Sequence, residues 1–486
     1  MRLSFALLFL VGSTAQAQFK DPAVPQLLTL EPMDAPLASS YTELLSGAPA
    51  KSLSAQAKTE DWPSFQGSRR DGKSRESGLL TTWPTGGPSL VWSMQRGPGY
   101  SSPVVQGERL IYSHQGPAAQ TWIDCLHAET GKRFWRYAYS AEHTPMYPSF
   151  AGPRSTPIIE GSRVWIHGVE GVFHCLDLST GRVLWKRDLK QEFELEEQFF
   201  GVVSSPLLLG DNIIINLGAP QGPTVAAFDK TSGKLVWGMK SQGGMSCASP
   251  MLAPLHGEDR LFVLTGGKSR PPRGELLVLD PAQGEMVASF PFRSRTYESV
   301  NGCNPVVVDS SVFLTSKYST GSIGVRLDKG AQAAQAWRAK RLGIEFSTPI
   351  VHRKKLFLID GVRDRGGALV CLDPQSGTEL LRTDLEWEEQ VLIDGEERTL
   401  DAGVGTGSLL HVGGDRFLCL GDNGHLVLIE STQEKTTVLE RTALFHASET
   451  WTPLVLSRGL LYVCQNKSEN LGQAPPRLMC FDLRGK

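Results

Sequence analysis

The chain has 486 residues, 40% of them hydrophobic, with 50 Gly, 30 Pro and a formal net charge of −2. The length is sufficient for a large core, and the abundance of Gly and Pro favours many turns over long helices. Because 49 basic and 51 acidic residues are mixed along the chain without a basic tract, nucleic acid is not an expected partner.

The first 17 residues have the pattern of a secretory signal peptide. Arg2 supplies a positive start, residues 5–11 form a short apolar run, and Ala15 and Ala17 place small side chains at the cleavage positions. The apolar run is too short to span a bilayer, and no later segment reaches that length. We therefore expect cleavage after Ala17 and a soluble, monomeric protein that is periplasmic or secreted. No Cys lies near the cleavage point to carry a lipid anchor.

Residues 18–60 are rich in Ala, Pro, Ser and Leu and lack strand alternation. They predict a partly disordered leader, with a docking segment for a partner as the other interpretation. Residues 61–486 are expected to form a single domain.

One hairpin recurs eight times in that domain. Its clearest copy is residues 175–185, in which Asp177 can accept hydrogen bonds from the turn, Gly181 supplies a positive φ and Trp185 restarts a strand. The position of Leu176 recurs every 45 to 56 residues. Its equivalents are Leu126, Phe228, Leu279, Leu327, Leu372, Leu428 and Phe481.

A second landmark opens each repeat. A Ser, Thr or Asn followed by Pro precedes a short apolar run in seven repeats, and the seventh repeat has Thr406-Gly407-Ser408 instead. Pro is tolerated at the first residue of a strand because its missing N–H falls at the end of the ladder. The prolines are Pro103, Pro157, Pro206, Pro250, Pro305, Pro349 and Pro453.

A period near 50 residues with about four strands per period predicts an all-β, eight-bladed β-propeller of antiparallel blades. The last repeat lacks its outer strand, so the segment Leu90–Trp92 is expected to complete that blade and close the ring. The recurrent tryptophans are expected to pack between neighbouring blades. They are Trp92, Trp135, Trp185 and Trp237, with Trp337 as a further candidate.

The eight cysteines have two expected fates. Four occupy the same repeat position and are predicted to be small buried hydrophobes, because equivalent positions in different blades lie too far apart for a disulfide. These four are Cys125, Cys175, Cys371 and Cys480. Cys247 and Cys303 precede matching strands of neighbouring repeats and are the best candidates for a bonded pair, whose state the sequence leaves open.

The Asp-x-x-x-Gly-x-x-x-Trp hairpin resembles the repeat of pyrroloquinoline-quinone (PQQ)-type propellers. The segments 62–67 and 70–72 also resemble a leader that often precedes such repeats in exported bacterial proteins. The resemblance covers residue 61 to the C-terminus. It implies either a PQQ-dependent dehydrogenase or a non-catalytic scaffold, and the chain is more similar to BamB-type outer-membrane assembly scaffolds.

The dehydrogenase alternative carries specific requirements. It implies Ca²⁺ held by carboxylate and amide oxygens, a quinone that the ion polarises, and an Asp base beside the alcohol. That family often has a disulfide between adjacent cysteines, and no two cysteines are consecutive here. PQQ and Ca²⁺ are therefore expected only under this alternative, and otherwise we predict neither cofactor nor catalytic residue.

Candidate ligand-binding residues lie just before the inner strands, where a propeller has its central funnel. Counting four residues back from the opening Pro selects Ser246, Asn301, Glu345 and Glu449, while Arg154 lies one position later and Asn304 directly precedes its Pro. These groups suit a cation, a sugar or a charged peptide. The other interpretation is that they are solvated residues that satisfy turn backbones.

No other motif indicates chemistry. None of the ten His lies in a metal-binding spacing, no metal site is predicted, and His167 and His174 are expected to be ordinary sheet residues. The leading prediction is an exported, non-catalytic propeller that binds a protein or polysaccharide partner in the cell envelope, since fixed loops on a rigid ring form a recognition surface. The alternative is a PQQ-dependent alcohol or sugar dehydrogenase.

Overall fold

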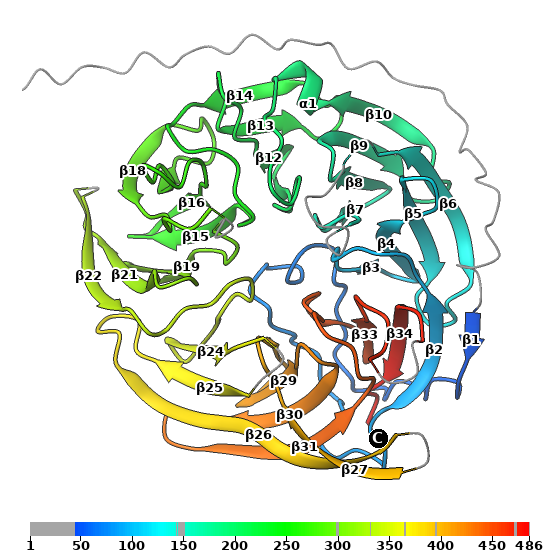
Figure 1. Ribbon diagram of the computed structural model, residues 1–486. Helices are drawn as coiled ribbons and strands as arrows, with labels where there is room; N and C mark the ends of the chain where they lie inside the picture. The colour runs from blue at the N-terminus through cyan, green and yellow to red at the C-terminus, as the bar shows by residue number, and fades with distance from the viewer. Residues whose placement is uncertain are drawn as a thin grey trace, which may run out of the picture.

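Eight antiparallel sheets surround a central axis in the computed structural model (Figure 1). The structure describes residues 44–141, 143, 151–297, 301–330, 332–363, 366–393, 396–470 and 474–485. The predicted eight-bladed propeller is confirmed. The predicted signal peptide and the leader as far as residue 43 lie outside the described residues.

Each of the first seven blades runs from an inner to an outer strand in chain order, and blade 8 takes its outer strands from the N-terminal part of the chain. The first four blades are β3 (Val104–Gln106), β4 (Arg109–Gln115), β5 (Gln120–His127) and β6 (Arg133–Ser140); β7 (Ile158–Glu160), β8 (Arg163–His167), β9 (Val172–Asp177) and β10 (Val183–Asp188); β11 (Leu207–Leu209), β12 (Asn212–Asn216), β13 (Val225–Asp229) and β14 (Leu235–Met239); and β15 (Met251–Leu255), β16 (Glu258–Leu264), β17 (Glu275–Leu279) and β18 (Met286–Pro291). One short helix, α1 (Leu189–Glu192), follows blade 2.

Blades 5 to 8 continue the same order with two extended sheets. They are β19 (Val306–Val308), β20 (Ser311–Ser316), β21 (Gly321–Leu327) and β22 (Ala333–Ala339); β23 (Ile350–His352), β24 (Lys355–Gly361), β25 (Gly367–Leu372), β26 (Glu379–Ile393) and β27 (Glu396–Gly403); β28 (Ser408–His411), β29 (Arg416–Leu420), β30 (His425–Ser431) and β31 (Thr436–Ala443); and β32 (Val455–Ser457), β33 (Leu460–Cys464), β34 (Arg477–Asp482), β2 (Ser89–Gln95) and β1 (Leu44–Ser46).

The outer hairpin of blade 2 shows why each blade turns where it does. Asp177 Oδ1 accepts hydrogen bonds from the backbone amides of Ser179 and Thr180 at 3.0 and 2.9 Å, and from both hydroxyls. Burial raises the pKa of Asp177, but these hydrogen bonds outweigh it and the pKa is lowered overall. Gly181, with φ +74°, donates its N–H to the Asp177 carbonyl at 2.8 Å and completes the turn.

The same glycine forms the contact between blade 1 and blade 2. A Cβ built on Gly181 would lie 2.6 Å from the ring of Trp135, so only glycine lets the tryptophan of blade 1 lie flat against the turn of blade 2. The Trp135 indole N–H also donates to the Leu178 carbonyl at 3.0 Å. Five such contacts occur among the described residues: Trp92 on Gly131, Trp135 on Gly181, Trp185 on Gly233, Trp237 on Gly284 and Trp337 on Gly377.

A girdle of hydrogen bonds joins the inner ends of the blades. The backbone N–H of Ser102 donates to Thr156 Oγ1 at 3.3 Å, that of Thr156 to Ser205 Oγ at 2.9 Å, and that of Ser205 to Ser249 Oγ at 2.9 Å. The N–H of Ser249 donates to Asn304 Oδ1 at 2.8 Å. All five residues directly precede the opening Pro of their strands and are buried. The residues before these prolines therefore link blades 1 to 5 in sequence.

The ring closes as predicted. Strand β2 pairs antiparallel with β34, so that Leu90 lies opposite Phe481 and Trp92 opposite Cys480. Strand β1 adds a fifth strand to this blade, with Leu44 opposite Met94. The sequence pattern of the leader does not predict β1, because three residues are too few to show alternation.

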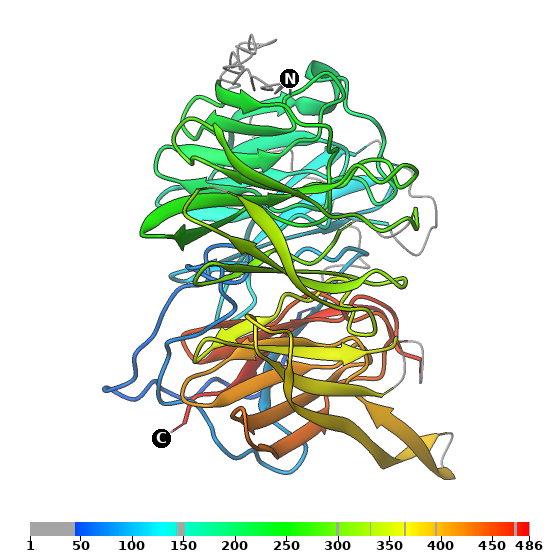
Figure 2. The same cartoon turned by 90° about the vertical axis from the view of Figure 1, so that its left-hand side faces the viewer.

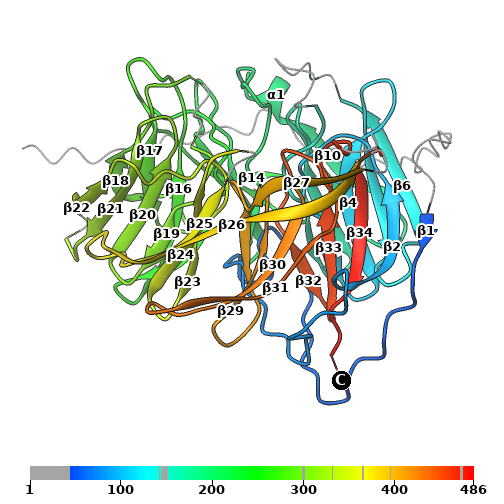
Figure 3. The ribbon, with the colours of Figure 1, turned by 60° about the horizontal axis from the view of Figure 1, so that its bottom comes forward.

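The leader continues across the ring (Figure 1) and loops below it (Figure 3). Trp62 exchanges two backbone hydrogen bonds with Val105 of blade 1, at 2.9 and 2.8 Å. The buried Arg70 guanidinium donates to the Pro206 carbonyl of blade 3 at 2.7 Å. Glu76 accepts hydrogen bonds from two backbone amides of blade 8. These contacts bind one segment to three blades. No helix in the described part of the chain is long and apolar enough to cross a membrane.

Blade 2 contains two histidines without an ion-pair partner. His167 and His174 are both 1% exposed within the sheet. Burial lowers the pKa of each to about 3, because a charged imidazole cannot be solvated there. Both are therefore neutral core residues at neutral pH.

Removal of an inter-blade tryptophan should destabilise the ring. Trp185 is fully buried, so Trp185→Ala is expected to lower the free energy of unfolding by about 3–5 kcal/mol. Urea unfolding followed by circular dichroism measures this loss. The matched control is Val236→Ala on the same outer-strand segment, where the side chain is 51% exposed and the change should stay within about 0.5 kcal/mol. Equal midpoints for the two variants would contradict the assigned role of the tryptophan.

The buried histidines predict a loss of stability in acid. The pKa of His167 is about 3 in the folded state against 6.5 in the unfolded chain, so between these values only the unfolded state binds the proton. Stability should fall as the pH falls from 6.5 towards 3, by up to about 1.4 kcal/mol per pH unit for this group. His167→Leu should show a shallower fall of the urea midpoint with falling pH than the wild type shows. Parallel pH profiles for His167→Leu and wild type would refute this.

Candidate functional site

A pocket lies on the ring axis, at the ends where the innermost strands begin. Its cavity volume is about 90 Å³. In six blades the lining includes the residue three positions before the opening Pro. These six residues are Tyr100, Arg154, Val203, Cys247, Gly302 and Phe346. Trp451 lines it from blade 8 and Phe65 from the leader.

Aromatic rings form much of the pocket wall. Tyr100 and Trp451 stack with their centroids 5.6 Å apart and their planes 24° apart, and Phe346 lies 5.0 Å from Trp451. The Arg154 guanidinium lies 4.6 Å from the Tyr100 ring centroid and 4.9 Å from that of Phe200. Such cation–π contacts hold the arginine in place while its charge remains at the pocket wall.

The charges around the pocket come from one acidic group and several basic ones. Burial lowers the pKa of Arg154, while Tyr100 and Glu449 oppose that shift. Glu449 accepts a hydrogen bond from the Tyr100 hydroxyl at 3.2 Å and pairs with Arg363 at 3.2 Å and Lys467 at 3.3 Å. Because two cations surround the single carboxylate, the rim around Tyr100 carries a net positive charge and favours an anionic or polar partner group.

Two of the predicted site residues line this pocket, Arg154 and Asn304. Asn304 also accepts the girdle hydrogen bond described above, so its carbonyl oxygen is engaged. Glu449 lies beside the pocket through Tyr100. Glu345 accepts a hydrogen bond from the Tyr318 hydroxyl at 2.7 Å, away from the aromatic wall.

Ser246 and Asn301 do not line the pocket. Ser246 is 3% exposed and its hydroxyl bonds to the Leu264 carbonyl and to Asn216 Nδ2. Asn301 is 1% exposed, and its amide donates to the carbonyls of Thr265 and Phe292 at 2.8 and 2.9 Å. Both side chains bond to backbone groups inside the blades, and they are buried instead of solvated.

The difference comes from counting four residues back instead of three. These positions lie in irregular segments before the inner strands, where Asn301 has a φ of +52° and Glu449 one of +58°. A shift of one residue therefore changes the side-chain direction, and in blades 4 and 5 it exchanges a pocket residue for a buried one. The aromatic residues Tyr100 and Phe346 at the third position, and Trp451 next to it, were the signal that could have indicated the correct side.

All eight cysteines are free. Cys125, Cys175, Cys371 and Cys480 are buried, in the positions predicted for small hydrophobes. Cys247 faces the axial pocket at the third position before its Pro, whereas Cys303 stands at the second position and is buried. Because these positions point to opposite sides, the candidate pair forms no disulfide.

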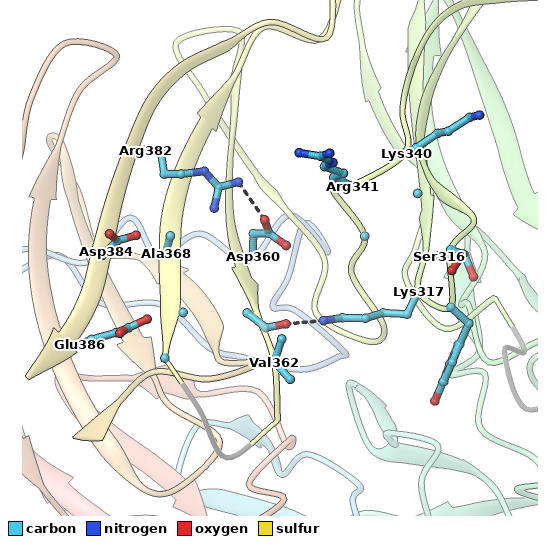
Figure 4. Close-up of a pocket in the computed structure, with 17 residues that line it drawn as sticks. Ser316, Lys317, Lys340, Arg341, Asp360, Val362, Ala368, Arg382, Asp384 and Glu386 are labelled. Atoms are coloured by element: carbon cyan, nitrogen blue, oxygen red, sulfur yellow. Dashed lines mark hydrogen bonds and ion pairs between the residues drawn. The ribbon is translucent and has the colours of Figure 1, made fainter. Parts of the chain in front are cut away.

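A second hollow, of about 410 Å³, lies between blades 5 and 6 (Figure 4). Arg382 pairs with Asp360 at 2.8 Å and with Glu379 at 2.9 Å. The Lys317 ammonium donates to the Gly361 carbonyl across the interface. These charges are engaged within and between the two blades, so the axial pocket is the better candidate for binding.

The sequence matches the family described as "Outer membrane protein assembly factor BamB" over residues 74–222, 119–380 and 221–485. The chain belongs to this family. A curated BamB from Kangiella koreensis is 27% identical over 190 residues, which is 39% of this chain and 42% of that relative. The match thus spans less than half the length of the curated relative.

Solved structures share the propeller of this BamB-family chain. BamB from Moraxella catarrhalis superposes with a TM-score of 0.50 at 15% identity, over 82% of this chain and 98% of that one. A europium-containing methanol dehydrogenase gives a TM-score of 0.59 at 12% identity, over 87% and 98% of the two chains. A quinohemoprotein alcohol dehydrogenase from Pseudomonas putida gives 0.59 at 11%, over 88% and 80%. At these identities the likeness shows the fold alone.

The axial pocket does not fit a metal-held quinone. Among the described residues its lining contains no Asp or Glu, whereas Ca²⁺ requires several oxygen ligands, usually carboxylates. Glu449, which lies beside the pocket, is paired with Arg363 and Lys467. The cavity of about 90 Å³ is also well below the ~300–1,000 Å³ typical of pockets for small-molecule ligands.

Proposed function

We propose that this chain is an exported, non-catalytic scaffold that binds a protein partner in the cell envelope. Family membership supports this, because the relatives that match carry the name of an outer membrane protein assembly factor. Export rests on the signal-peptide pattern of residues 1–17. The proposal needs no cofactor, in keeping with the poor fit of the axial pocket to a quinone.

The aromatic axial pocket is the observation that carries the proposal. Tyr100, Phe346 and Trp451 present rigid rings, and Arg154 adds a charge held by cation–π contacts. Buried aromatic and arginine side chains dominate the binding energy of protein interfaces, since they lose little conformational freedom on binding. A cavity of about 90 Å³ suits one inserted side chain better than a whole small ligand.

The shape of the partner contact follows from the ring. The pocket residues come from seven blades and the leader, and the girdle and the inter-blade tryptophans join neighbouring blades of the ring. A partner that inserts an apolar or acidic side chain at the axis would meet a surface that needs no rearrangement. Such preorganisation lowers the entropic cost of binding.

Loss of the Trp451 ring should weaken partner binding about tenfold or more, which is the range of an interface hot spot. The tagged mature chain is used to capture partners from its own envelope, and proteins and glycans in the eluate are quantified. The matched control is Phe134→Ala, which removes an aromatic ring that is 47% exposed on outer strand β6 and should leave capture unchanged. Circular dichroism checks that both variants fold.

Three outcomes would contradict the proposal. Unchanged protein capture by Trp451→Ala would exclude the axial pocket as the interface. Enrichment of a polysaccharide in place of a protein would show the other kind of partner. Stoichiometric uptake of PQQ with Ca²⁺, with substrate-dependent dye reduction, would show a quinoprotein dehydrogenase instead of a non-catalytic scaffold.

A further inference from the structure

The longest interval between repeats, from Leu372 to Leu428, contains an insertion. Strand β26 continues past its blade and pairs with β27, from Glu386 opposite Gly403 to Ile393 opposite Glu396. This hairpin projects beyond the ring at the lower right of Figure 2. Its base lies against blade 7, whose strand β30 begins at His425.

Three potential metal ligands meet at this contact. Glu389 comes from the hairpin, His425 opens β30, and His446 follows β31. Their ligand atoms all lie within 4.8 Å of one another. His425 Nε2 lies 3.0 and 2.9 Å from the two Glu389 oxygens, and His446 Nδ1 lies 3.7 Å from Glu389 Oε1.

The surroundings fix the orientation of His425. Its ring is 2% exposed, its Nδ1 lies 2.8 Å from Asn423 Oδ1, and the Trp387 ring meets it edge-on at 5.2 Å. In the neutral tautomer whose Nδ1–H donates to the Asn423 oxygen, the ring presents the Nε2 lone pair to the Glu389 carboxylate. Two acceptors at 2.9 Å need a cation between them, either a proton or a metal ion.

We propose that Glu389, His425 and His446 together bind one divalent transition-metal ion of the Zn²⁺ class. Two imidazole nitrogens and one carboxylate match the ligand preference of zinc and leave a fourth position for water. The hydrogen bond from His425 to Asn423 is the second-shell contact that metal-binding histidines usually have. The proposal is independent of the axial pocket and of the partner proposed above.

The proposed site is accessible from solvent and lies near negatively charged side chains. The side chains of His446 and Glu389 are 28% and 19% exposed, so the site can be reached from solvent. A cavity of about 600 Å³ adjoins it, and its lining includes Asn423 and Trp387, both in contact with His425. Three carboxylates also line that cavity and attract cations: Glu386, Glu388 and Asp401.

A second cluster, at the ends of β23 and β28, lacks a free ligand set and provides the control. His352 Nε2 lies 2.7 Å from Asp415, and the His411 ring lies 4.7 Å from that of His352. However, His411 uses Nε2 on the Gly414 carbonyl, at 2.9 Å, and Nδ1 accepts a hydrogen bond from the Gly413 amide. Asp415 also pairs with Arg353. This cluster is therefore an inter-blade ion pair.

The test is titration of the chelator-treated full chain with Zn²⁺ alone, followed by isothermal calorimetry and by thermal unfolding. We expect one saturable site per chain and a rise in the unfolding temperature with Zn²⁺ concentration, because the ion binds the folded state. Glu389→Gln and His446→Ala should each weaken Zn²⁺ binding at least tenfold. His352→Ala should leave the affinity and stoichiometry unchanged.

Bound Co²⁺ supplies a second readout on the wild-type chain, since its visible absorption reports nitrogen and oxygen ligands directly. His446→Gln, which retains side-chain volume at a partly exposed position, replaces His446→Ala if the latter does not fold. Absence of a saturable site in the wild type would overturn the proposal. So would unchanged Zn²⁺ affinity in both ligand variants, which would leave Glu389 and His425 as an ion pair that anchors the hairpin.

Discussion

The packing of a tryptophan from one blade onto the turn glycine of the next is the interaction on which the ring depends. Each blade alone would expose an apolar face, and Trp135 covers that face only because Gly181 has no side chain to keep it away. The Asp177 turn places the glycine where the ring needs it. The same few residues therefore form both a local turn and a contact between blades, and they recur around the molecule.

The inner ends of the blades are fixed in a different way. Hydrogen bonds from Ser102 through Thr156 and Ser205 pass from blade to blade and use residues that directly precede a proline. This girdle joins the residues of blades 1 to 5 that follow the pocket-lining positions. The pocket formed by Tyr100, Trp451 and their neighbours is thus a consequence of ring closure, and no single blade contains it.

The segments that depart from the repeat supply side chains and strands that the regular blades lack. The leader crosses the ring and contributes Phe65 to the axial pocket, and strand β1 extends the closing blade. The β26–β27 hairpin lengthens blade 6 and brings Glu389 to His425 of blade 7. The regular parts of the sequence build the scaffold, and the irregular parts supply groups that the repeat does not encode.

The sequence by itself determined the eightfold repeat, the strand order and the closure by Leu90–Trp92, because each depends on local turn chemistry and on hydrophobic alternation. It did not determine which neighbouring residue faces the axis. Ser246 and Asn301 were selected, but they lie buried, while Tyr100 and Phe346 occupy the adjacent register position and line the pocket. Nor could it show that Glu389, His425 and His446 meet. Those outcomes depend on side-chain direction and on contacts between distant segments, which only the closed ring fixes.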